Sequence, residues 1–400
     1  MAVFLKRFLA PEWVFIFGIG FAIEADDAMR AQRRLPRGYA GAAMRILYVI
    51  GTRPNFVKTA PVIGALRKRD PEGRHAIVHT GQHYDRLMSE VFLEELGVPA
   101  PDYMLEVGSG SHAVQTARTM ERLEPVLADE KPDLVMVPGD VNSTLAAALT
   151  AVKMGIRVAH IESGLRSFDM TMPEEVNRIV ADRFSEWLFL HSPEAVTNLE
   201  HEGIPDERMH MVGNTMIDTL VALEDRFRAA GAAARLEVES GSYLLVTLHR
   251  PALVDGPLLG ETVAQLTALA QQLPVVFPVH PRTRKMMEGL EPQHPGLHLI
   301  EPLGYLDFLS LLADAGAVLT DSGGIQEETT YLGIPCFTLR DNTERPVTLT
   351  SGTNTLLGLD PAAIARIPAL IAERSGAPLS PPPLWDGRAA QRIADVILLG

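Results

Sequence analysis

The chain has 400 residues, 46% of them hydrophobic and 22% charged, which is ordinary for a soluble globular protein and long enough for two or three domains. A formal net charge of -14 and a pI near 5.3 leave no basic surplus to neutralise a nucleic-acid backbone, so no nucleic-acid partner is expected. The single cysteine, Cys336, excludes an internal disulfide and a cysteine-built zinc site, and it favours a reducing, cytoplasmic location.

The first 43 residues differ in character from the rest of the chain. Lys6 and Arg7 precede the apolar stretch WVFIFGIGFAI, which is shorter than the roughly 20 apolar residues that span a bilayer. No convincing small-residue cleavage site follows, whereas MRILYVIGTRP, from Met44 onward, reads like the start of an α/β domain. We expect residues 1–43 to be an extension outside the fold, which a misassigned start codon would explain. An interfacial anchor is the alternative, and no stable membrane insertion is expected.

From Arg45 onward, short apolar runs alternate with longer segments of helical period. The apolar runs predict strands over residues 45–50, 75–80, 133–139, 157–162 and 187–191. Helices are predicted over residues 56–69, 85–96, 112–129, 143–154 and 193–203. Continuous apolar strands that alternate with helices form parallel sheets covered on both faces, so this half predicts a doubly wound domain.

A second series of the same kind starts near residue 241, with apolar runs over residues 242–249, 274–280, 297–302, 317–322 and 335–340. The chain therefore predicts an α/β fold of two Rossmann-like, doubly wound domains. We expect an N-terminal domain over residues 44–211 and a C-terminal domain over 212–385. The last helix, within 386–400, should pack back on the first domain. Because ligands of such sheets bind at the carboxyl ends of the strands, the active site is expected in the inter-domain cleft.

The first predicted strand leads into GTRPNFVK. Arg53 offers a bidentate fork for an anion, and Lys58 lies one turn into the following helix. A surface arginine and lysine at a helix started by Pro54 is the structural alternative, but the position at a strand end favours anion binding. The stretch matches neither the Walker pattern nor GxGxxG, so neither a nucleoside triphosphate nor NAD is indicated.

Acidic residues stand at two further strand ends. Asp140 follows the third predicted strand, and Glu162 ends an otherwise apolar strand, where a carboxylate is costly unless it is used. The stretch HIESGLRSFDMTMPEEVNR then starts a helix at Pro173 that carries Glu174 and Glu175. Carboxylates in a first turn also complement the helix dipole. We take that structural explanation for Glu175 and the functional one for Asp140, Glu162 and Glu174.

Two histidines end strands of the second series, His249 in VTLHR and His280 in PVHPRTR. A lone histidine is more often a packed or surface residue than a catalyst. Both are expected to face the inter-domain cleft, which favours a functional role for His249 and leaves His280 undecided. No HExxH or DxD cluster indicates a catalytic metal, and no cofactor is expected.

The stretch TDSGGIQEETTYLG breaks an apolar run with two glycines and then starts a helix. Such a turn presents free backbone N–H groups to a phosphate, which Ser322, Gly323 and Gly324 would cradle. Glu328 suits the two hydroxyls of a ribose, and Arg345 in RDNTERP adds a second anion contact. Phosphates, a ribose and acid/base groups across a cleft together indicate a nucleotide sugar.

Residues 44–400 resemble the non-hydrolysing UDP-N-acetylglucosamine 2-epimerases. The matching motifs are, in order, GTRPNFVK, TGQHYD, PGDVNST, HIESGLRSFDMTMPEEVNR, VGNTMID, TLHR, PVHPR, LTDSGGIQEE, RDNTERP and WDGRAAQRI. The family is similar in fold to glycosyltransferases of the B type, with the active site between two Rossmann-like domains. It is usually dimeric, so the resemblance also implies a homodimer.

The resemblance implies a reaction and a role for each matched residue. The family inverts C2 of UDP-GlcNAc to give UDP-ManNAc, by eliminating UDP to a bound 2-acetamidoglucal and re-adding it with protonation on the opposite face. The implied proton-transfer carboxylates are Asp140, Glu162 and Glu174, and His249 would contact the diphosphate. The matching UDP-binding positions are Arg53, Lys58, Ser322, Gly323, Gly324, Glu328 and Arg345.

The chain departs from the family after His249-Arg250, where a Glu-Asn pair is usual and Pro251-Ala252-Leu253 stands here. The SFDMTMPEE stretch also resembles relatives that act on UDP-acetamido-uronic acids, so the exact sugar stays open. The alternatives are a UDP-sugar-dependent glycosyltransferase of the same fold, a hydrolysing relative and a non-catalytic nucleotide-sugar sensor. The set of three carboxylates favours the epimerase.

Overall fold

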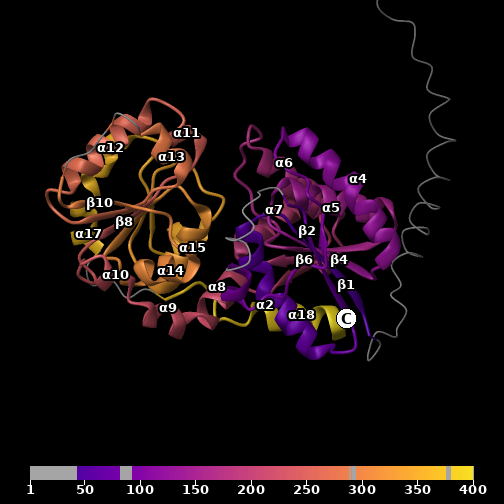
Figure 1. Cartoon of the computed structure of the whole chain (residues 1–400). Helices are drawn as coiled ribbons and strands as arrows, with labels where there is room; N and C mark the ends of the chain where they lie inside the picture. The colour runs from indigo at the N-terminus through magenta and orange to yellow at the C-terminus, as the bar shows by residue number, and fades with distance from the viewer. Residues whose placement is uncertain (1–42, 82–91, 288–289, 291–293, 375–379, 400) are drawn as a thin grey trace, which may run out of the picture. The chain divides into compact units, whose positions relative to one another are not determined.

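The computed structural model describes residues 43–81, 92–287, 290, 294–374 and 380–399 (Figure 1). The predicted extension over 1–43 lies outside these residues except for its last one, and so does most of the predicted helix 85–96. Residues 92–96, the end of that helix, are helical. In the part of the chain that is described, no helix is both long and apolar enough to cross a membrane.

The first half of the described chain forms a parallel sheet of seven strands. Its order is β3-β2-β1-β4-β5-β6-β7, with β1 (Arg45–Ile50), β2 (Arg74–His79), β3 (Tyr103–Met104), β4 (Leu134–Pro138), β5 (Arg157–Ile161), β6 (Trp187–Leu190) and β7 (Met209–Met211). The apolar runs that predicted five of these strands are almost wholly buried, as expected for a sheet covered on both faces. Sequence analysis missed β3 and β7, because two or three residues are too few to show a period.

Helices cover this sheet on both faces. The helices α4 (His112–Glu130), α5 (Asn142–Lys153) and α6 (Pro173–Phe184) lie together, and their apolar residues share one core with the strands (Figure 1). The helices α2 (Arg53–Arg69) and α18 (Ala389–Leu399) lie side by side in Figure 1, and Arg69 forms an ion pair with Asp395. The short α7 (Pro193–His201) follows β6.

The second half forms a parallel sheet of six described strands. Its order is β10-β9-β8-β11-β12-β13, with β8 (Leu244–Thr247), β9 (Val275–Pro278), β10 (Leu297–Ile300), β11 (Ala317–Thr320), β12 (Cys336–Thr338) and β13 (Asn354–Leu356). The accompanying helices are α11 (Pro251–Val254), α12 (Leu258–Leu269), α13 (Pro281–Met286), α14 (Tyr305–Asp314), α15 (Gly323–Leu332), α16 (Val347–Thr350) and α17 (Ile367–Arg374). Sequence analysis predicted all of these strands except β13. The prediction of two doubly wound units is confirmed.

The helices α8 (Thr215–Ala222), α9 (Glu224–Ala230) and α10 (Ala232–Arg235) connect the two sheets along the chain. Asp218 of α8 accepts hydrogen bonds from the backbone N–H groups of Ala389 (3.0 Å) and Ala390 (2.7 Å), so it caps the start of α18. The Trp385 indole donates to the carbonyl oxygen of His191 at 2.8 Å. The end of the chain is thus fastened to earlier elements. The domain boundary at 211–212 falls directly after β7 and stays a prediction.

The strand orders explain where functional residues gather. In the first sheet, the order in which the chain adds strands reverses between β1 and β4. In the second sheet, it reverses between β8 and β11. Ligands of open parallel sheets bind beyond the carboxyl ends of the strands at such points. Five of the polar residues singled out in the sequence follow these four strands and β5 by one to three residues: Arg53, Asp140, Glu162, His249 and Ser322.

Candidate active site

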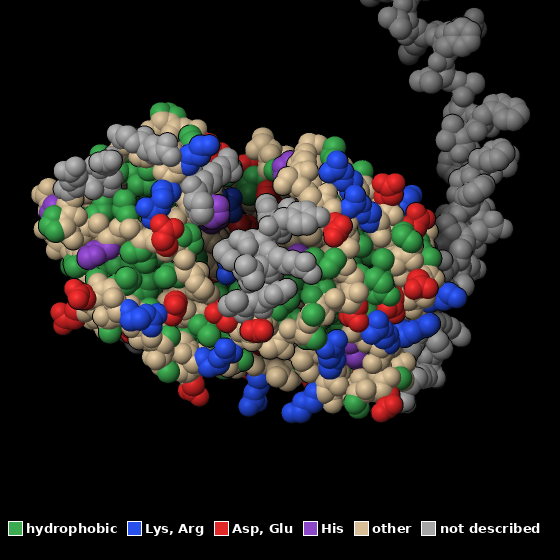
Figure 2. Space-filling model, in the orientation of Figure 1, with side chains coloured by type: hydrophobic (Ala, Val, Ile, Leu, Met, Phe, Trp, Pro, Cys, Tyr) green, Lys and Arg blue, Asp and Glu red, His purple; other side chains and the backbone are tan. Residues whose placement is uncertain are grey.

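A cavity of about 520 Å³ lies against residues of both sheets. From the first half it is lined by the start of α2, by the loop after β4 and by α6. From the second half it is lined by the loop after β8, by α14 and α15, and by the segment at 344–345. On the face of the molecule drawn in Figure 2, basic and acidic side chains are interspersed.

Ten of the eleven residues proposed from the sequence line this cavity. They are Arg53, Lys58, Asp140, Glu174, His249, Ser322, Gly323, Gly324, Glu328 and Arg345. The eleventh, Glu162, is buried behind the lining. These residues come from positions up to about 290 apart in the chain, so the fold brings together a group that the sequence only suggested.

The start of α15 forms the anion-binding side of the cavity. Ser322 is its N-cap and makes no side-chain cap hydrogen bond, so the first N–H groups of the helix are available to a ligand. A Cβ atom added to Gly323 would lie 2.3 Å from Arg345 Nη1 and 3.0 Å from Glu344 Oε1. Glycine is required here because the Arg345 guanidinium lies against the turn.

Arg345 is a buried cation held by three carboxylates. It lies 2.8 Å from Glu162, 3.0 Å from Glu327 and 2.6 Å from Glu344, measured from different guanidinium nitrogens. Burial opposes its charge, but these carboxylates raise the pKa of Arg345 well above its ordinary value. Arg345 therefore stays charged and rigid beside the helix start.

Glu162 pairs with two cations at once. Its carboxylate lies 2.5 Å from Lys58 Nζ and 2.8 Å from Arg345 Nη2, and its side chain is 4% exposed. Its φ of 65° is in the left-handed region, which is uncommon for a residue other than glycine. A strained residue that holds two cavity-lining cations is a candidate for function. The structure turns its carboxylate toward those cations.

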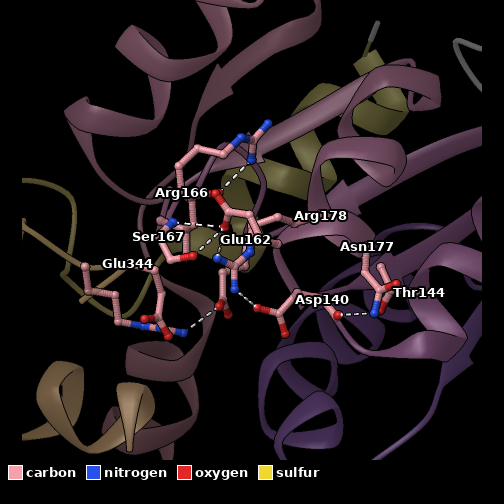
Figure 3. Close-up of polar contacts among 12 residues, drawn as sticks. Asp140, Thr144, Glu162, Arg166, Ser167, Asn177, Arg178 and Glu344 are labelled. Atoms are coloured by element: carbon pink, nitrogen blue, oxygen red, sulfur yellow. Dashed lines mark hydrogen bonds and ion pairs between the residues drawn. The ribbon is translucent and has the colours of Figure 1, made fainter. Parts of the chain in front are cut away.

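Asp140 is held from two directions at the end of β4. Its carboxylate forms an ion pair with Arg178 of α6, and Asn177 donates to its backbone carbonyl at 2.9 Å. Figure 3 shows Asp140, Glu162, Arg178 and Glu344 turned toward one another. Arg178 also lines the cavity. The sequence motif contained Arg178, but nothing in its spacing distinguished it from a surface arginine.

The two glutamates of the first turn of α6 have different environments. Glu174 lines the cavity, and its carboxylate makes no hydrogen bond or ion pair with any described residue. Glu175 is buried and accepts hydrogen bonds from the backbone N–H groups of Ser167 (2.9 Å) and Phe168 (2.8 Å). Glu175 thus fixes the preceding loop, which agrees with a structural role.

His249 is held by Asp321, which sequence analysis did not single out. The Asp321 carboxylate accepts from the backbone N–H groups of His249 (2.8 Å) and Arg250 (2.7 Å), and His249 Nδ1 lies 2.9 Å from its other oxygen. Burial opposes ionisation, but His249 and these N–H groups lower the pKa of Asp321. The His249 side chain is 55% exposed, and Asp321 leaves its Nε2 available on the cavity side.

Two aromatic residues, Phe92 and Tyr305, also line the cavity. The Tyr305 hydroxyl donates to Glu328 at 3.1 Å, and the rings of Tyr305 and Phe92 meet edge to face at 5.6 Å. The Arg53 guanidinium lies 4.6 Å from the centre of the Phe92 ring. Burial raises the pKa of Glu328 to about 8. Phe92 and Tyr305 gave no sequence signal, since isolated aromatics in helical segments usually belong to a core.

Glu344 is a further cavity carboxylate that sequence analysis missed. It pairs with Arg340 at 2.8 Å and with Arg345 at 2.6 Å, and Arg250 lies 3.8 Å away. Burial opposes its charge, but these three arginines lower the pKa of Glu344 well below its ordinary value. It stands in the RDNTERP motif, beside the arginine that was proposed.

Some residues considered in the sequence lie elsewhere. His280 is exposed and does not line the cavity. Where the family usually has a Glu-Asn pair, Leu253 is 1% exposed in the core of the second sheet, and Ala252 faces solvent. Neither lines the cavity. Among the described residues, no group of three or more His, Cys, Asp or Glu side chains could hold a metal ion.

Comparisons with known proteins agree with this architecture. A family described as UDP-N-acetylglucosamine 2-epimerase matches residues 65–398. A UDP-N-acetylglucosamine 2-epimerase of Methanococcus maripaludis is 43% identical over 333 residues, which are 80% of this chain and 89% of that protein. A UDP-2,3-diacetamido-2,3-dideoxy-D-glucuronate 2-epimerase of Pseudomonas aeruginosa is 44% identical over 79% of this chain and 88% of its own length.

A solved structure of the Methanocaldococcus jannaschii UDP-GlcNAc 2-epimerase, in complex with UDP-GlcNAc and UDP, is also similar. It is 38% identical in sequence and has a TM-score of 0.80, covering 89% of this chain and all of that chain. The similarity extends over both sheets, so the predicted fold is supported along nearly the whole described chain.

Proposed function

The chain belongs to the UDP-N-acetylglucosamine 2-epimerase family, and on that premise we propose that it inverts C2 of UDP-GlcNAc to give UDP-ManNAc. One observation carries the proposal. A single cavity sets an anion-binding helix start, Arg345 and His249 against the carboxylates of Asp140 and Glu174. Such a site can hold a departing diphosphate while it moves a proton at the neighbouring sugar.

The proposed chemistry is elimination followed by re-addition. The C2 hydrogen of UDP-GlcNAc has no adjacent carbonyl to acidify it, so deprotonation alone is hard. In the proposed step the C1–O bond breaks, UDP leaves with the bonding electrons, and C2 gives its proton to an enzyme carboxylate. The product is bound 2-acetamidoglucal, with a C1–C2 double bond. UDP then adds back at C1 while an acid protonates C2 on the opposite face.

Glu174 is the carboxylate best placed to exchange a proton with the sugar. It lines the cavity, and no described side chain pairs with it. Asp140 lines the same cavity, where its carboxylate is paired with Arg178 and would face a developing oxocarbenium ion. Glu162 is engaged with Lys58 and Arg345, so direct proton transfer by Glu162 requires one of those pairs to open.

The remaining lining residues suit the UDP part of the substrate. The N–H groups at the start of α15 would receive a phosphate, with His249 Nε2 beside them. Glu328 would meet the ribose hydroxyls. The Arg53 guanidinium and the Phe92 ring, which lie against each other, would stack on the nucleobase, since aromatic rings and guanidinium planes stack readily on bases.

We further propose that the protein works in the cytoplasm as a homodimer and supplies a sugar for polysaccharide biosynthesis. The single cysteine, which suits a reducing compartment, supports the location. The family resemblance supports the dimer.

Proton NMR of the full chain with UDP-GlcNAc in D2O tests the proposed function. We expect UDP-ManNAc signals to appear and deuterium to replace the hydrogen at C2. A chain with Glu174→Gln serves as the comparison and should show both changes about 100-fold more slowly or slower still. Binding of UDP-GlcNAc without any exchange at C2 would contradict the proposal, and it would point to a glycosyltransferase that awaits an acceptor or to a sensor. Release of free ManNAc would indicate a hydrolysing enzyme.

A second candidate substrate follows from the Pseudomonas aeruginosa relative. That protein acts on a diacetamido glucuronate and is 44% identical to this chain. The same NMR experiment with a UDP-diacetamido-uronic acid distinguishes the two. Faster deuterium incorporation at C2 of that sugar than of UDP-GlcNAc would assign the modified sugar as the substrate.

A further inference from the structure

His160 lies on β5, two residues before Glu162, and its side chain is fully buried. Its Nδ1 is 2.7 Å from Asp182 Oδ1 on α6, and its Nε2 is 2.7 Å from the carbonyl oxygen of Gly139 at the end of β4. The imidazole therefore makes two short hydrogen bonds, one on each ring nitrogen. The proposed mechanism does not use it.

Both partners of His160 can only accept. A backbone carbonyl oxygen has no proton to give. The other oxygen of Asp182, Oδ2, accepts from Arg166 Nη1 at 2.7 Å and from the Gly164 N–H group at 3.1 Å, contacts that suit a carboxylate. A neutral imidazole carries one N–H group and would direct a lone pair at one of the two oxygens. Only the imidazolium, with two N–H groups, satisfies both contacts.

The surrounding charges are compatible with a cationic His160. Asp182 Oδ2 accepts from Arg166 Nη1 at 2.7 Å, and Arg166 Nε lies 2.7 Å from Glu202. Glu202 is exposed to solvent and shares Arg166 with the buried Asp182, and a cationic His160 brings these four groups to zero net charge. The other nearby charge is Lys58, whose Nζ lies 3.1 Å from the place a Cβ of Gly139 would take, and it is paired with Glu162.

The contacts of His160 join the three segments that carry the candidate carboxylates. Gly139, with a φ of 63°, directly precedes Asp140. His160 lies on β5, and Glu162 directly follows the last residue of that strand. Asp182 belongs to α6, whose first turn carries Glu174. One buried ring therefore connects the two strand ends and the helix from which the acid/base groups project.

We propose that His160 is a positioning residue, held as an imidazolium, that fixes the relative placement of Asp140, Glu162 and Glu174. The expected effect of His160 on turnover rests on the proposed function, whereas the charge state of its imidazole can be tested without it. The two parts can therefore be tested separately.

The charge is tested by nitrogen NMR on the full chain labelled with [15N]histidine at neutral pH. We expect one of the twelve histidines to show both ring nitrogens protonated, with two ring N–H signals protected from exchange. The variant His160→Gln should remove this signal set, and His160→Asn is the second route to the assignment. A neutral tautomer at His160, with one unprotonated nitrogen, would overturn the proposal.

The positioning role is tested by the kinetics of His160→Gln beside His210→Gln. His210 lies on β7 of the same sheet and packs beside Phe189, outside the cavity lining. We expect His160→Gln to lower kcat on the order of 100-fold, because small misplacements of reacting groups cost about this much, with KM changed less than about twofold. His210→Gln should leave both unchanged. An equal effect of the two variants would show that His160 does not position the site.

A double-mutant cycle separates charge balance from folding. Asp182→Asn leaves a buried imidazolium without its carboxylate, and His160→Gln leaves Asp182 with Arg166 alone as its cationic partner, so each should lower the urea midpoint. The double variant should unfold at a higher urea concentration than the sum of the single losses predicts, since both charges are gone. Simple additivity would contradict a charged pair. Absence of turnover in the unaltered chain would contradict the proposed function, while the nitrogen spectrum would still decide the charge of His160.

Discussion

Replacing Gly323 by alanine is the sharpest test of the anion-binding helix start. The new Cβ would lie 2.3 Å from Arg345 Nη1, more than 1 Å short of the 3.4 Å at which ordinary contact begins. The guanidinium cannot step aside cheaply, because Glu162, Glu327 and Glu344 hold it. Either the turn or the arginine must therefore move.

The expected size follows from these contacts. An extra methyl group in a well-packed site costs about 1–3 kcal/mol, and a displaced Arg345 would also spoil the phosphate site. We expect the free energy of unfolding to fall by that amount and the Kd for UDP to rise about tenfold or more, which corresponds to about 1.4 kcal/mol.

Gly64→Ala is the matched control. Gly64 stands inside α2, is exposed, and has nothing within 4 Å of its added Cβ. Alanine should stabilise that helix by about 0.5–1 kcal/mol and leave UDP binding unchanged. Urea unfolding and calorimetric titration with UDP measure both quantities. If Gly323→Ala binds UDP as tightly as Gly64→Ala and is as stable, Arg345 does not enforce glycine at the helix start.

Glu328→Gln should change how stability depends on pH. The pKa of Glu328 is raised to about 8 in the folded chain, whereas the unfolded chain loses this proton at lower pH. The neutral carboxyl therefore contributes less to the stability of the folded chain as the pH rises toward 8. Glutamine cannot ionise, so the free energy of unfolding of the variant, measured by urea titration, should rise by a few kcal/mol relative to that of the unaltered chain between about pH 5 and 8. Parallel pH curves for the two chains would contradict the raised pKa of Glu328. Glu174→Gln should lower kcat by about 100-fold or more with little change in KM, as expected for loss of a general acid/base. Glu200→Gln, a control at an exposed position of α7, should leave kcat unchanged. Equal kcat values for the two variants in a steady-state assay would show that Glu174 takes no part in the mechanism.

The sequence revealed the residues whose place depends on chain order alone. Asp140, Glu162 and His249 directly follow apolar strands, so the alternation of strands and helices already puts them at one edge of a sheet. The glycines before α15 were equally visible, since a tight turn before a helix has few other uses.

The residues that the sequence did not reveal depend on tertiary contacts. Phe92 and Tyr305 lie more than 200 positions apart, and only the folded chain brings their rings together beside Arg53. The direction of the Glu162 carboxylate depends on its left-handed backbone conformation and on two cations from other elements. No local pattern records such contacts.

The capping of α18 by Asp218 has a consequence for synthesis of the chain. This helix lies beside α2, yet it is translated about 320 residues after α2. The first sheet is therefore translated well before one of its covering helices exists. The outer side of α2 stays open while about 320 residues are added. A nascent chain is thus expected to depend on chaperones or on slow docking of α18, and deletion of α18 should destabilise the first half of the described chain rather than the second.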